Sequence, residues 1–467
     1  MAKVYTLISV HTEDCINPET DEVPLRLAEI ANRHGCQIVP KVTTEKIRSL
    51  KRNGRSDVIE ALKTQDVGFH MTDHSFPPTV PVYNQNASWD EGIREFERRE
   101  RLGYDEWRAT FGRDAPTYAQ GVETPFAFPV LRQWGIPTYT CSSCVSLGGL
   151  PMHYMGILKQ DWGAPNGLHL GFQVTDPGMA EQFVAQFDAI YHRLHQGEGG
   201  VVSISSHEVE WATRGFWDAN FRQGRLVLPR DFRRAPIKSR EELERGLRTF
   251  ETLLEHVRTL PDSEVISSRR LHDLYRDRLA GEELTMDEVA ALAKAMSEEI
   301  TFRPVRGQYA SAAEVFGLVV SALDHYFRLG SLPETVRVSF LGGPPRSAET
   351  RRPQEPMSPD ILAHVLADVA DYLAFHQRVP AEAWRGNDPL SAGDFLATVS
   401  RVLMALHRKG EVPSAIEIAR GNVTCLGHAP ERASVSIWPS FPPGFADDNG
   451  VAFARLQCWT LKPAVRG

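Results

Sequence analysis

The chain of 467 residues has only six cysteines, and its 52 Lys and Arg do not outnumber its 60 Asp and Glu. So few cysteines exclude the disulfide framework of a small secreted domain. A net charge of −8 gives no overall attraction to nucleic acid or to an anionic membrane, so we expect neither as a partner. No apolar run approaches the roughly 18 residues of a membrane span, and residues 4–10 read as a strand rather than a signal sequence. We therefore expect a cytoplasmic protein.

What the chain does contain is an ordinary globular composition, with 42% hydrophobic and 24% charged residues. Short apolar runs alternate with amphipathic helical periods over about the first 280 residues. The expected strands are residues 4–10, 37–42, 67–70, 137–142 and 201–206, and helical periods cover residues 26–34, 94–108 and 179–195. This alternation predicts an α/β fold with a mostly parallel sheet or barrel, whose functional residues lie at the carboxyl ends of the strands.

After residue 284 the chain reads as helices joined by turns that contain proline, and it repeats itself. The stretch that begins at Ser311 aligns without a gap on the stretch that begins at Ser391, and Gly330 then matches Gly410. Each copy reads as capped helices followed by Gly-x-x-Pro and a short β-branched strand. We therefore expect three parts, which are a barrel of residues 1–280, a duplicated helical module with short strands at 281–420, and a strand-rich tail at 421–467.

Polar clusters follow two of the expected strands. His11, Glu13 and Asp14 follow the first strand, where adjacent carboxylates can divide cation binding and proton transfer between them, although a turn cap would use the same residues. His70 and His74 close the third strand, and imidazoles four residues apart can reach one metal ion. In a barrel, the two strand ends together would form a two-histidine, one-carboxylate face with coordination positions left open.

His207 closes a later strand, residues 201–206. A lone histidine is most often a packed residue. At the mouth of a barrel that already holds a metal ion, however, it can act as a general acid.

These three stretches, in this order, resemble the polysaccharide deacetylase family, also called the NodB homology domain. That family consists of metal-dependent de-N-acetylases on a (β/α)7-type barrel, so the resemblance implies this fold and activity for about the first 280 residues. The second family motif, His-Ser/Thr-x-x-His, is similar to residues 70–74, which have Met71 in the Ser/Thr place. The resemblance implies that His70 and His74 bind the metal ion.

The first family motif ends in a pair of acids, and Glu13 and Asp14 fall there. The resemblance implies Glu13 as the general base and Asp14 as the third metal ligand. Some relatives separate the two acids by one residue, which would place Glu13 on the metal and His11 in the base position. His207 matches the late strand-terminal histidine, which implies a proton donor to the leaving amine.

Two family motifs differ here. The third, Arg-x-Pro-Tyr-Gly, falls on residues 117–121, which read Thr-Tyr-Ala-Gln-Gly, so Gln120 stands there and Arg113 could supply the arginine only from a loop that folds back. The fourth, an Asp before Trp, has Asp161 and Trp162 as its candidate. We expect these four residues, with His11, on the substrate side of the site, and the substrate itself is not implied.

The prediction is a metal-dependent amide hydrolase, most simply a de-N-acetylase of an N-acetylated carbohydrate. Zinc is the default ion for two histidines and one carboxylate, and cobalt, nickel or iron fit the same ligands. An allantoinase-like hydrolase of a small cyclic amide is the first alternative, and a non-catalytic glycan-binding or scaffold protein is the second. The same ligand face could also serve a non-haem iron oxygenase. The C-terminal copies resemble pseudomurein-binding repeats, which implies glycan binding; a module for homo-oligomerisation is the alternative.

Overall fold

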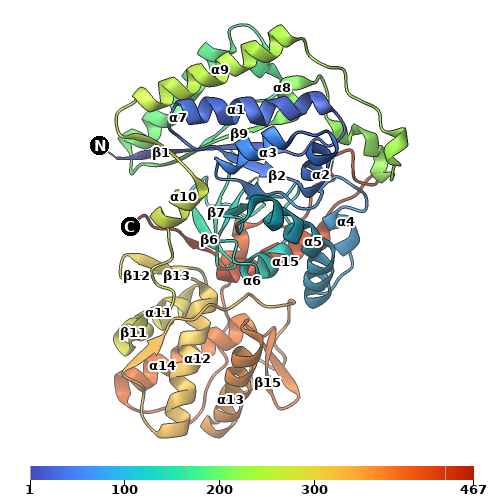
Figure 1. Ribbon diagram of the computed structural model, residues 1–467. Coiled ribbons are helices and arrows are strands. Elements are labelled where there is room, and N and C mark those ends of the chain that lie inside the picture. Colours follow the sequence, from blue (N-terminus) through green and yellow to red (C-terminus); the bar gives the residue numbers. More distant parts are fainter. Residues whose placement is uncertain (1, 142–143, 164, 437) are drawn as a thin grey trace. The chain divides into compact units, whose positions relative to one another are not determined.

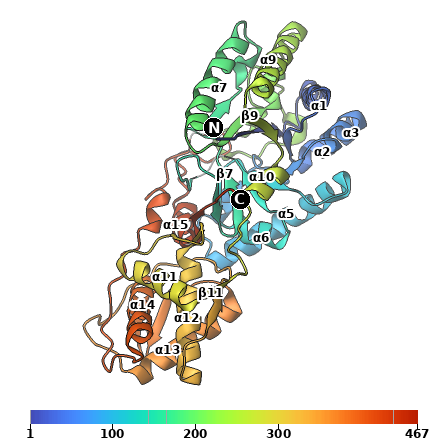
Figure 2. The same ribbon diagram turned by 90° about the vertical axis from the view of Figure 1, so that its left-hand side faces the viewer.

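The computed structural model describes residues 2–141, 144–163, 165–436 and 438–467, and it divides into two units (Figure 1, Figure 2). Unit 1 comprises Met1–Pro151, Ile157–Leu274 and Ala433–Gly450. Unit 2 comprises Met152–Gly156, Tyr275–Arg432 and Val451–Gly467. The expected third part, residues 421–467, is thus divided between them. Among the described residues, no helix combines the length and the hydropathy that crossing a membrane would require.

Unit 1 is built on a curled sheet of parallel strands in the order β7-β5-β4-β3-β2-β1-β9-β8. Strand β10 pairs with the first half of β1, on the edge where β2 pairs with its second half. In the described part of the chain β7 and β8 do not pair with each other, so the α/β class is confirmed and the exact (β/α)7 closure is not. The strands are β1 (Val4–Thr12), β2 (Val39–Val42), β3 (Gly68–Phe69), β4 (Thr117–Tyr118), β5 (Thr138–Thr140), β7 (Ile157–Gln160), β8 (Gly167–His169), β9 (Gly200–His207) and β10 (Ser263–Ile266).

Helices connect most of these strands, and α7 and α9 lie side by side in both views (Figure 1, Figure 2). Capping boxes start the two longest, at Ser88 for α5 and at Ser239 for α9. The expected strands and helices all have counterparts, except that residue 142 lies outside the described residues. The helices are α1 (Glu22–Arg33), α2 (Thr44–Arg52), α3 (Ser56–Lys63), α4 (Val80–Asn84), α5 (Trp89–Phe111), α6 (Ala127–Gln133), α7 (Met179–Gln196), α8 (Glu208–Ala212), α9 (Arg240–Thr259) and α10 (Ser268–Leu274).

Strands β1 and β9 orient the polar residues of the sheet. Their apolar side chains pack with α1, α7 and α9 in one buried core, to which the strands contribute Val4, Ile8, Val10, Val202 and Ile204. Because side chains alternate along a strand, Ser9 and His11 face the other side of the sheet. The parallel register sets His11 beside His207. Simple alternation therefore brings these two histidines together at the carboxyl edge.

Unit 2 contains four helices around one apolar core. Helices α12 and α14 each have 18 residues, begin after Ser311 and Ser391, and end at Gly330 and Gly410 in the left-handed conformation. The order helix, hairpin, helix occurs twice where the sequence repeats. The elements are α11 (Met286–Glu298), β12 (Arg303–Val305), β13 (Gln308–Ala310), α12 (Ala312–Leu329), α13 (Pro359–His376), β15 (Glu382–Arg385), β16 (Asp388–Ser391) and α14 (Ala392–Lys409), with β11 (Glu283–Thr285) paired to β14 (Thr335–Arg337).

The end of the chain is not strand-rich, contrary to expectation. Its described residues form two 3-10 turns, η5 (Cys425–His428) and η6 (Cys458–Thr460), the helix α15 (Asp448–Gln457), and a strand of two residues, β17 (Lys462–Pro463), which pairs with β6 (Met152–Tyr154). Pro439, Pro442 and Pro443 explain the difference, since proline lacks the N–H that a strand ladder needs.

Candidate metal centre

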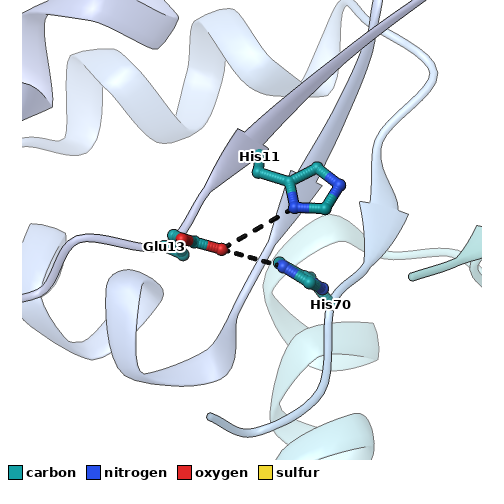
Figure 3. Close-up of side chains that lie close together, drawn as sticks. All are labelled: His11, Glu13 and His70. Atoms are coloured by element: carbon teal, nitrogen blue, oxygen red, sulfur yellow. Dashed lines mark hydrogen bonds and ion pairs between the residues drawn. The ribbon is translucent and has the colours of Figure 1, made fainter. Parts of the chain in front are cut away.

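One buried carboxylate lies among histidines from two strand ends. The Glu13 Oε2 atom is 2.9 Å from His70 Nε2, 2.6 Å from His74 Nε2 and 3.8 Å from His11 Nδ1. Figure 3 shows the carboxylate of Glu13, the residue after β1, pointing toward the rings of both His11 and His70. All four side chains are at most 7% exposed. The sequence-predicted residues His11, Glu13, His70 and His74 are therefore brought together.

The electrostatics of this cluster favour an ionised Glu13 carboxylate beside neutral His70 and His11, whereas the same carboxylate raises the pKa of His74 against the effect of burial. Burial by itself would raise the pKa of Glu13, but the charge of His74 and the hydrogen bonds to the imidazoles lower it well below its usual value. Burial lowers the pKa of His70 to about 4, against the pull of the Glu13 carboxylate. Burial and the neighbouring His70 also lower the pKa of His11 well below its usual value. Neutral imidazole and carboxylate are the forms that bind a metal ion.

The donor atoms fit a small divalent cation. Ligands of a tetrahedral ion with bonds of ~2.0–2.2 Å lie roughly 3.3–3.6 Å apart. The 3.8 Å between Glu13 Oε2 and His11 Nδ1 is near this range, whereas the 2.9 and 2.6 Å contacts with His70 and His74 are hydrogen-bond distances that an ion would lengthen. Two buried ring nitrogens, His11 Nε2 and His70 Nδ1, have no hydrogen-bond partner among the described residues. Ser75 Oγ lies 2.8 Å from His74 Nδ1 and fixes that ring with its Nε2 toward Glu13. The cluster thus has the ligand types and an outer contact typical of a metal site, and the donor atoms of His11, Glu13 and His70 lie within 4.8 Å of one another.

Asp14, the other acid of the predicted pair, points elsewhere. Its carboxylate accepts hydrogen bonds from the backbone N–H groups of Ile16 and Asn17, at 2.9 and 3.0 Å, and from Asn17 Nδ2 at 2.7 Å. Asp14 therefore has the turn-capping role that the sequence also permits. Of the two acids, the structure brings Glu13 to the histidines.

A buried charge network holds this turn in place. Glu208 Oε1 accepts from the backbone N–H groups of Glu13, at 2.5 Å, and Asp14, at 2.6 Å. The Lys46 ammonium donates to the Asp14 carbonyl at 2.8 Å and to Asp21 Oδ1 at 2.7 Å. Burial raises the pKa of Glu208 to about 8, although Lys46 opposes it. The position of Glu13 thus depends on α2, α8 and the segment before α1.

His207 is oriented by a second carboxylate. Glu210 Oε2 lies 3.3 Å from His207 Nδ1 and accepts the backbone N–H of His207 at 3.0 Å, while Glu210 Oε1 lies 3.1 Å from His169 Nε2. Burial lowers the pKa of His207, but the hydrogen bond to Glu210 and the nearby carboxylate charges raise it to about 9. The His207 ring lies 4.8 Å from the His11 ring. A protonated imidazolium therefore stands beside the candidate metal ligands.

Of the residues expected on the substrate side, Trp162 lies at the site and Arg113 does not. The Trp162 ring lies 4.5 Å from that of His11 and 6.0 Å from that of His207, so Trp162 belongs to the site. Gln120 follows β4 and has a buried Nε2 without a partner among the described residues. Asp161 follows β7, with its Oδ1 accepting from the Gly163 N–H at 2.8 Å. Arg113 donates to the Gln65 carbonyl at 2.5 Å, before β3 and β4, and is not brought to the site.

Asp218 and Trp438, which the sequence did not indicate as site residues, also lie beside the cluster. Asp218, on the 3-10 helix η3 (Trp217–Gly224), accepts a hydrogen bond from Trp438 Nε1 through its Oδ2, while its buried Oδ1 has no partner among the described residues. Burial raises the pKa of Asp218, and the Asp218 charge adds to the larger effect of Glu13, which raises the pKa of His74 against burial. The Trp438 ring lies 5.2 Å from that of His74. A residue from the last segment of unit 1 therefore lies against the candidate metal ligands.

No family model and no curated protein matches the chain. Among solved structures, a 4-alpha-glucanotransferase from Thermococcus litoralis is 10% identical, with a TM-score of 0.40. The match covers 70% of this chain and 47% of the glucanotransferase, so this chain spans less than half the length of that enzyme. Puue allantoinase is 9% identical with a TM-score of 0.38, over 58% and 91%. A "probable polysaccharide deacetylase" from Pseudomonas aeruginosa PAO1 is 11% identical with a TM-score of 0.38, over 58% and 92%. With TM-scores this low, function rests on the side chains of the site.

Proposed function

We propose that the chain is a metal-dependent amide hydrolase whose substrate is an N-acetylated carbohydrate. The observation that carries the proposal is Glu13 Oε2 within 3 Å of both His70 Nε2 and His74 Nε2, with the His207 ring 4.8 Å from the ring of neighbouring His11. Glu13, His70 and His74 would hold the ion, with His11 beside them. Zinc is the first choice for such ligands, and cobalt, nickel and iron are compatible with them. When bound, a divalent metal ion supplies Lewis acidity, which polarises an amide carbonyl and lowers the pKa of water.

The chain's own groups supply the proton transfers. His207, held protonated by Glu210, donates a proton to the nitrogen of the leaving amine. The unpartnered Oδ1 of Asp218 is a carboxylate oxygen that can accept a proton from the attacking water. With Glu13 in a ligand position, Asp218 takes the base role that the family resemblance gives to Glu13. The ring of Trp162 beside His11 and His207 offers an apolar face for a sugar.

The test compares His70→Ala and His74→Ala with wild-type protein and with His34→Ala. His34→Ala is an informative comparison because His34, Glu251 and Glu255 form a separate, more exposed group that could also hold a metal ion, so zinc lost only from the site variants belongs to the buried cluster. We expect both site variants to lose bound zinc and the release of acetate from N-acetylglucosamine oligomers, and His34→Ala to keep both. Full activity in either site variant, or in protein stripped of metal by a chelator, would refute the proposal.

The substrate class is tested with a second set of compounds. The same centre would also serve an allantoinase-like reaction, so cyclic ureides are assayed beside the N-acetyl sugars. Turnover of cyclic ureides alone would replace the carbohydrate assignment and keep the metal-dependent amide hydrolase. Purified protein without stoichiometric metal and without turnover of either class would favour a non-catalytic glycan-binding or scaffold protein.

A further inference from the structure

A pocket of about 690 Å³ lies in unit 1 within residues 215–236, the segment that follows α8. Four arginine side chains line it, together with one acidic residue, Asp231. The arginines are Arg222, Arg225, Arg233 and Arg234. Between residues 214 and 238 the chain has seven basic residues and two acidic ones, although the whole chain carries a net charge of −8. The pocket is therefore a local concentration of positive charge.

Most of this positive charge is not neutralised by the protein. Arg234 forms an ion pair with Glu19 at 3.0 Å. Arg222, Arg225 and Arg233 have no ion-pair partner among the described residues, and all three are exposed. Guanidinium groups bind phosphate oxygens with paired hydrogen bonds, and several of them together match a multiply charged group better than a single carboxylate.

The segment that carries the arginines is held in shape. Asn220 Nδ2 donates to the carbonyls of Trp217, at 2.8 Å, and Arg233, at 2.9 Å, and Asn220 Oδ1 accepts the Arg233 N–H at 2.7 Å. Buried Trp217 and Phe221 anchor η3 in a small apolar cluster. The backbone that carries Arg222 and Arg233 is thus held before a ligand arrives, which lowers part of the entropic cost of binding.

The pocket adjoins the candidate metal centre. Phe216 lines the pocket, and its ring lies 5.3 Å from the ring of His207. Helix η3 places Asp218 near His74 and His207, and Arg222 in the pocket. A substrate at the metal centre could therefore extend past Phe216 to the arginines.

We propose that this pocket binds a phosphate group of the substrate, so that the enzyme acts on a phosphorylated N-acetyl sugar rather than on a neutral one. The inference rests on the proposed hydrolase function, because it assigns the pocket to the substrate of that site.

The test measures binding of N-acetylglucosamine 6-phosphate, N-acetylglucosamine and glucuronate to the full-length, metal-loaded protein by calorimetry. We expect the phosphorylated sugar to bind at least about tenfold more tightly than the neutral one, as charge-assisted hydrogen bonds predict. This preference should disappear in the combined variant Arg222→Gln, Arg225→Gln, Arg233→Gln. It should remain in Arg230→Gln, which removes an exposed arginine of the same segment that does not line the pocket.

Three results would overturn the phosphate pocket. They are equal binding of the two sugars, a preference that survives the combined variant, and glucuronate binding as tight as that of the phosphorylated sugar. If the combined variant fails to fold, the single variants Arg222→Gln and Arg233→Gln must each weaken the preference. Binding and acetate release are measured in separate assays, so a phosphate preference in a protein that hydrolyses nothing would refute the proposed function alone. Hydrolysis of N-acetyl groups without the preference would refute the pocket alone.

Discussion

Glu13 and Asp14 are adjacent carboxylates in opposite surroundings. Glu13 faces two imidazoles, whereas Asp14 caps a turn. We therefore expect Glu13→Gln to lower the affinity for zinc by at least about 100-fold. Loss of a residue that only hydrogen-bonds to a metal ligand lowers metal affinity by about 10- to 100-fold, so a direct ligand should cost at least as much. Asp14→Asn should change the zinc affinity far less. Competition with a chromophoric chelator measures both affinities. The reverse order would make Asp14 the ligand.

The contact between His207 and Glu210 predicts how stability depends on pH in protein stripped of metal. The folded pKa of His207 is about 9, above its ordinary 6.5, so its contribution is complete below about pH 6.5 and is lost as the pH rises through 9. The folded pKa of Glu210 is about 2, because the hydrogen bonds to His169 and His207 outweigh burial, so its contribution is complete above 4.5 and is lost as the pH falls through 2. Glu210→Gln should therefore reduce the free energy of unfolding most between pH 4.5 and 6.5, by about 1–3 kcal/mol.

Urea unfolding at pH 5.5 and pH 9.5 checks this dependence. Glu251→Gln is the control, since it removes a contact with His34 on a more exposed surface and should cost less than Glu210→Gln. A loss that is the same at both pH values for Glu210→Gln would show that this carboxylate is not paired with His207.

At the scale of the strand and its turn, local patterns predicted much of the site. Alternation along β1 and β9 sets His11 and His207 side by side, and the His-x-x-x-His spacing sets His70 and His74 on one carboxylate. The choice between Glu13 and Asp14 could not be made in this way, because it depends on contacts with α2 and α8. Glu210, three residues after His207, was a visible signal that the sequence reasoning did not use.

Longer-range packing was beyond local patterns. Trp438 reaches His74 from a segment more than 350 residues later in the chain, and no local pattern around Trp438 indicates this contact. The arginine pocket likewise forms only when η3 and the segment after it fold back on each other through Asn220.

The close approach of the β4 loop to the last segment of unit 1 gives a prediction for these two elements. A Cβ on Gly121 would lie 2.6 Å from the ring of Trp438 and 2.9 Å from His74 Nδ1, so one of them must move. Gly121→Ala should cost about 1–3 kcal/mol of stability, as overpacking does. Part of that loss should be regained when Trp438→Ala is added, since the new methyl group then has space.

A double-mutant cycle from urea unfolding measures this coupling. Gly427→Ala is the control, because a Cβ there meets nothing within 4 Å. Purely additive losses for Gly121→Ala and Trp438→Ala would mean that the two elements are not in contact.

At the scale of the whole molecule, net charge and composition do not reveal local clusters of charge or which segments pack together. The net charge of −8 predicts no general attraction to nucleic acid, but it says nothing about the seven basic residues between 214 and 238. The expected linear order of barrel, module and tail likewise hides the fact that each unit is assembled from three separate segments. Neither property follows from composition, because both depend on which distant segments of the chain pack against each other.

This assembly predicts that the chain cannot be shortened at its end without damage to both units. Removal of residues 433–467 takes Trp438 and the Asn449 hydrogen bonds to the Asn84 and Ala87 carbonyls from unit 1. It also takes buried Lys462, which contacts Asp277 and Glu314 at 2.8 and 2.7 Å, from unit 2. Leaving buried Glu314 and partly exposed Asp277 without their cation is destabilising, so we expect the truncated chain to unfold at lower urea and to be cleaved by protease in both units. Truncation that left both units as resistant to protease as in the full chain would instead support a separate tail.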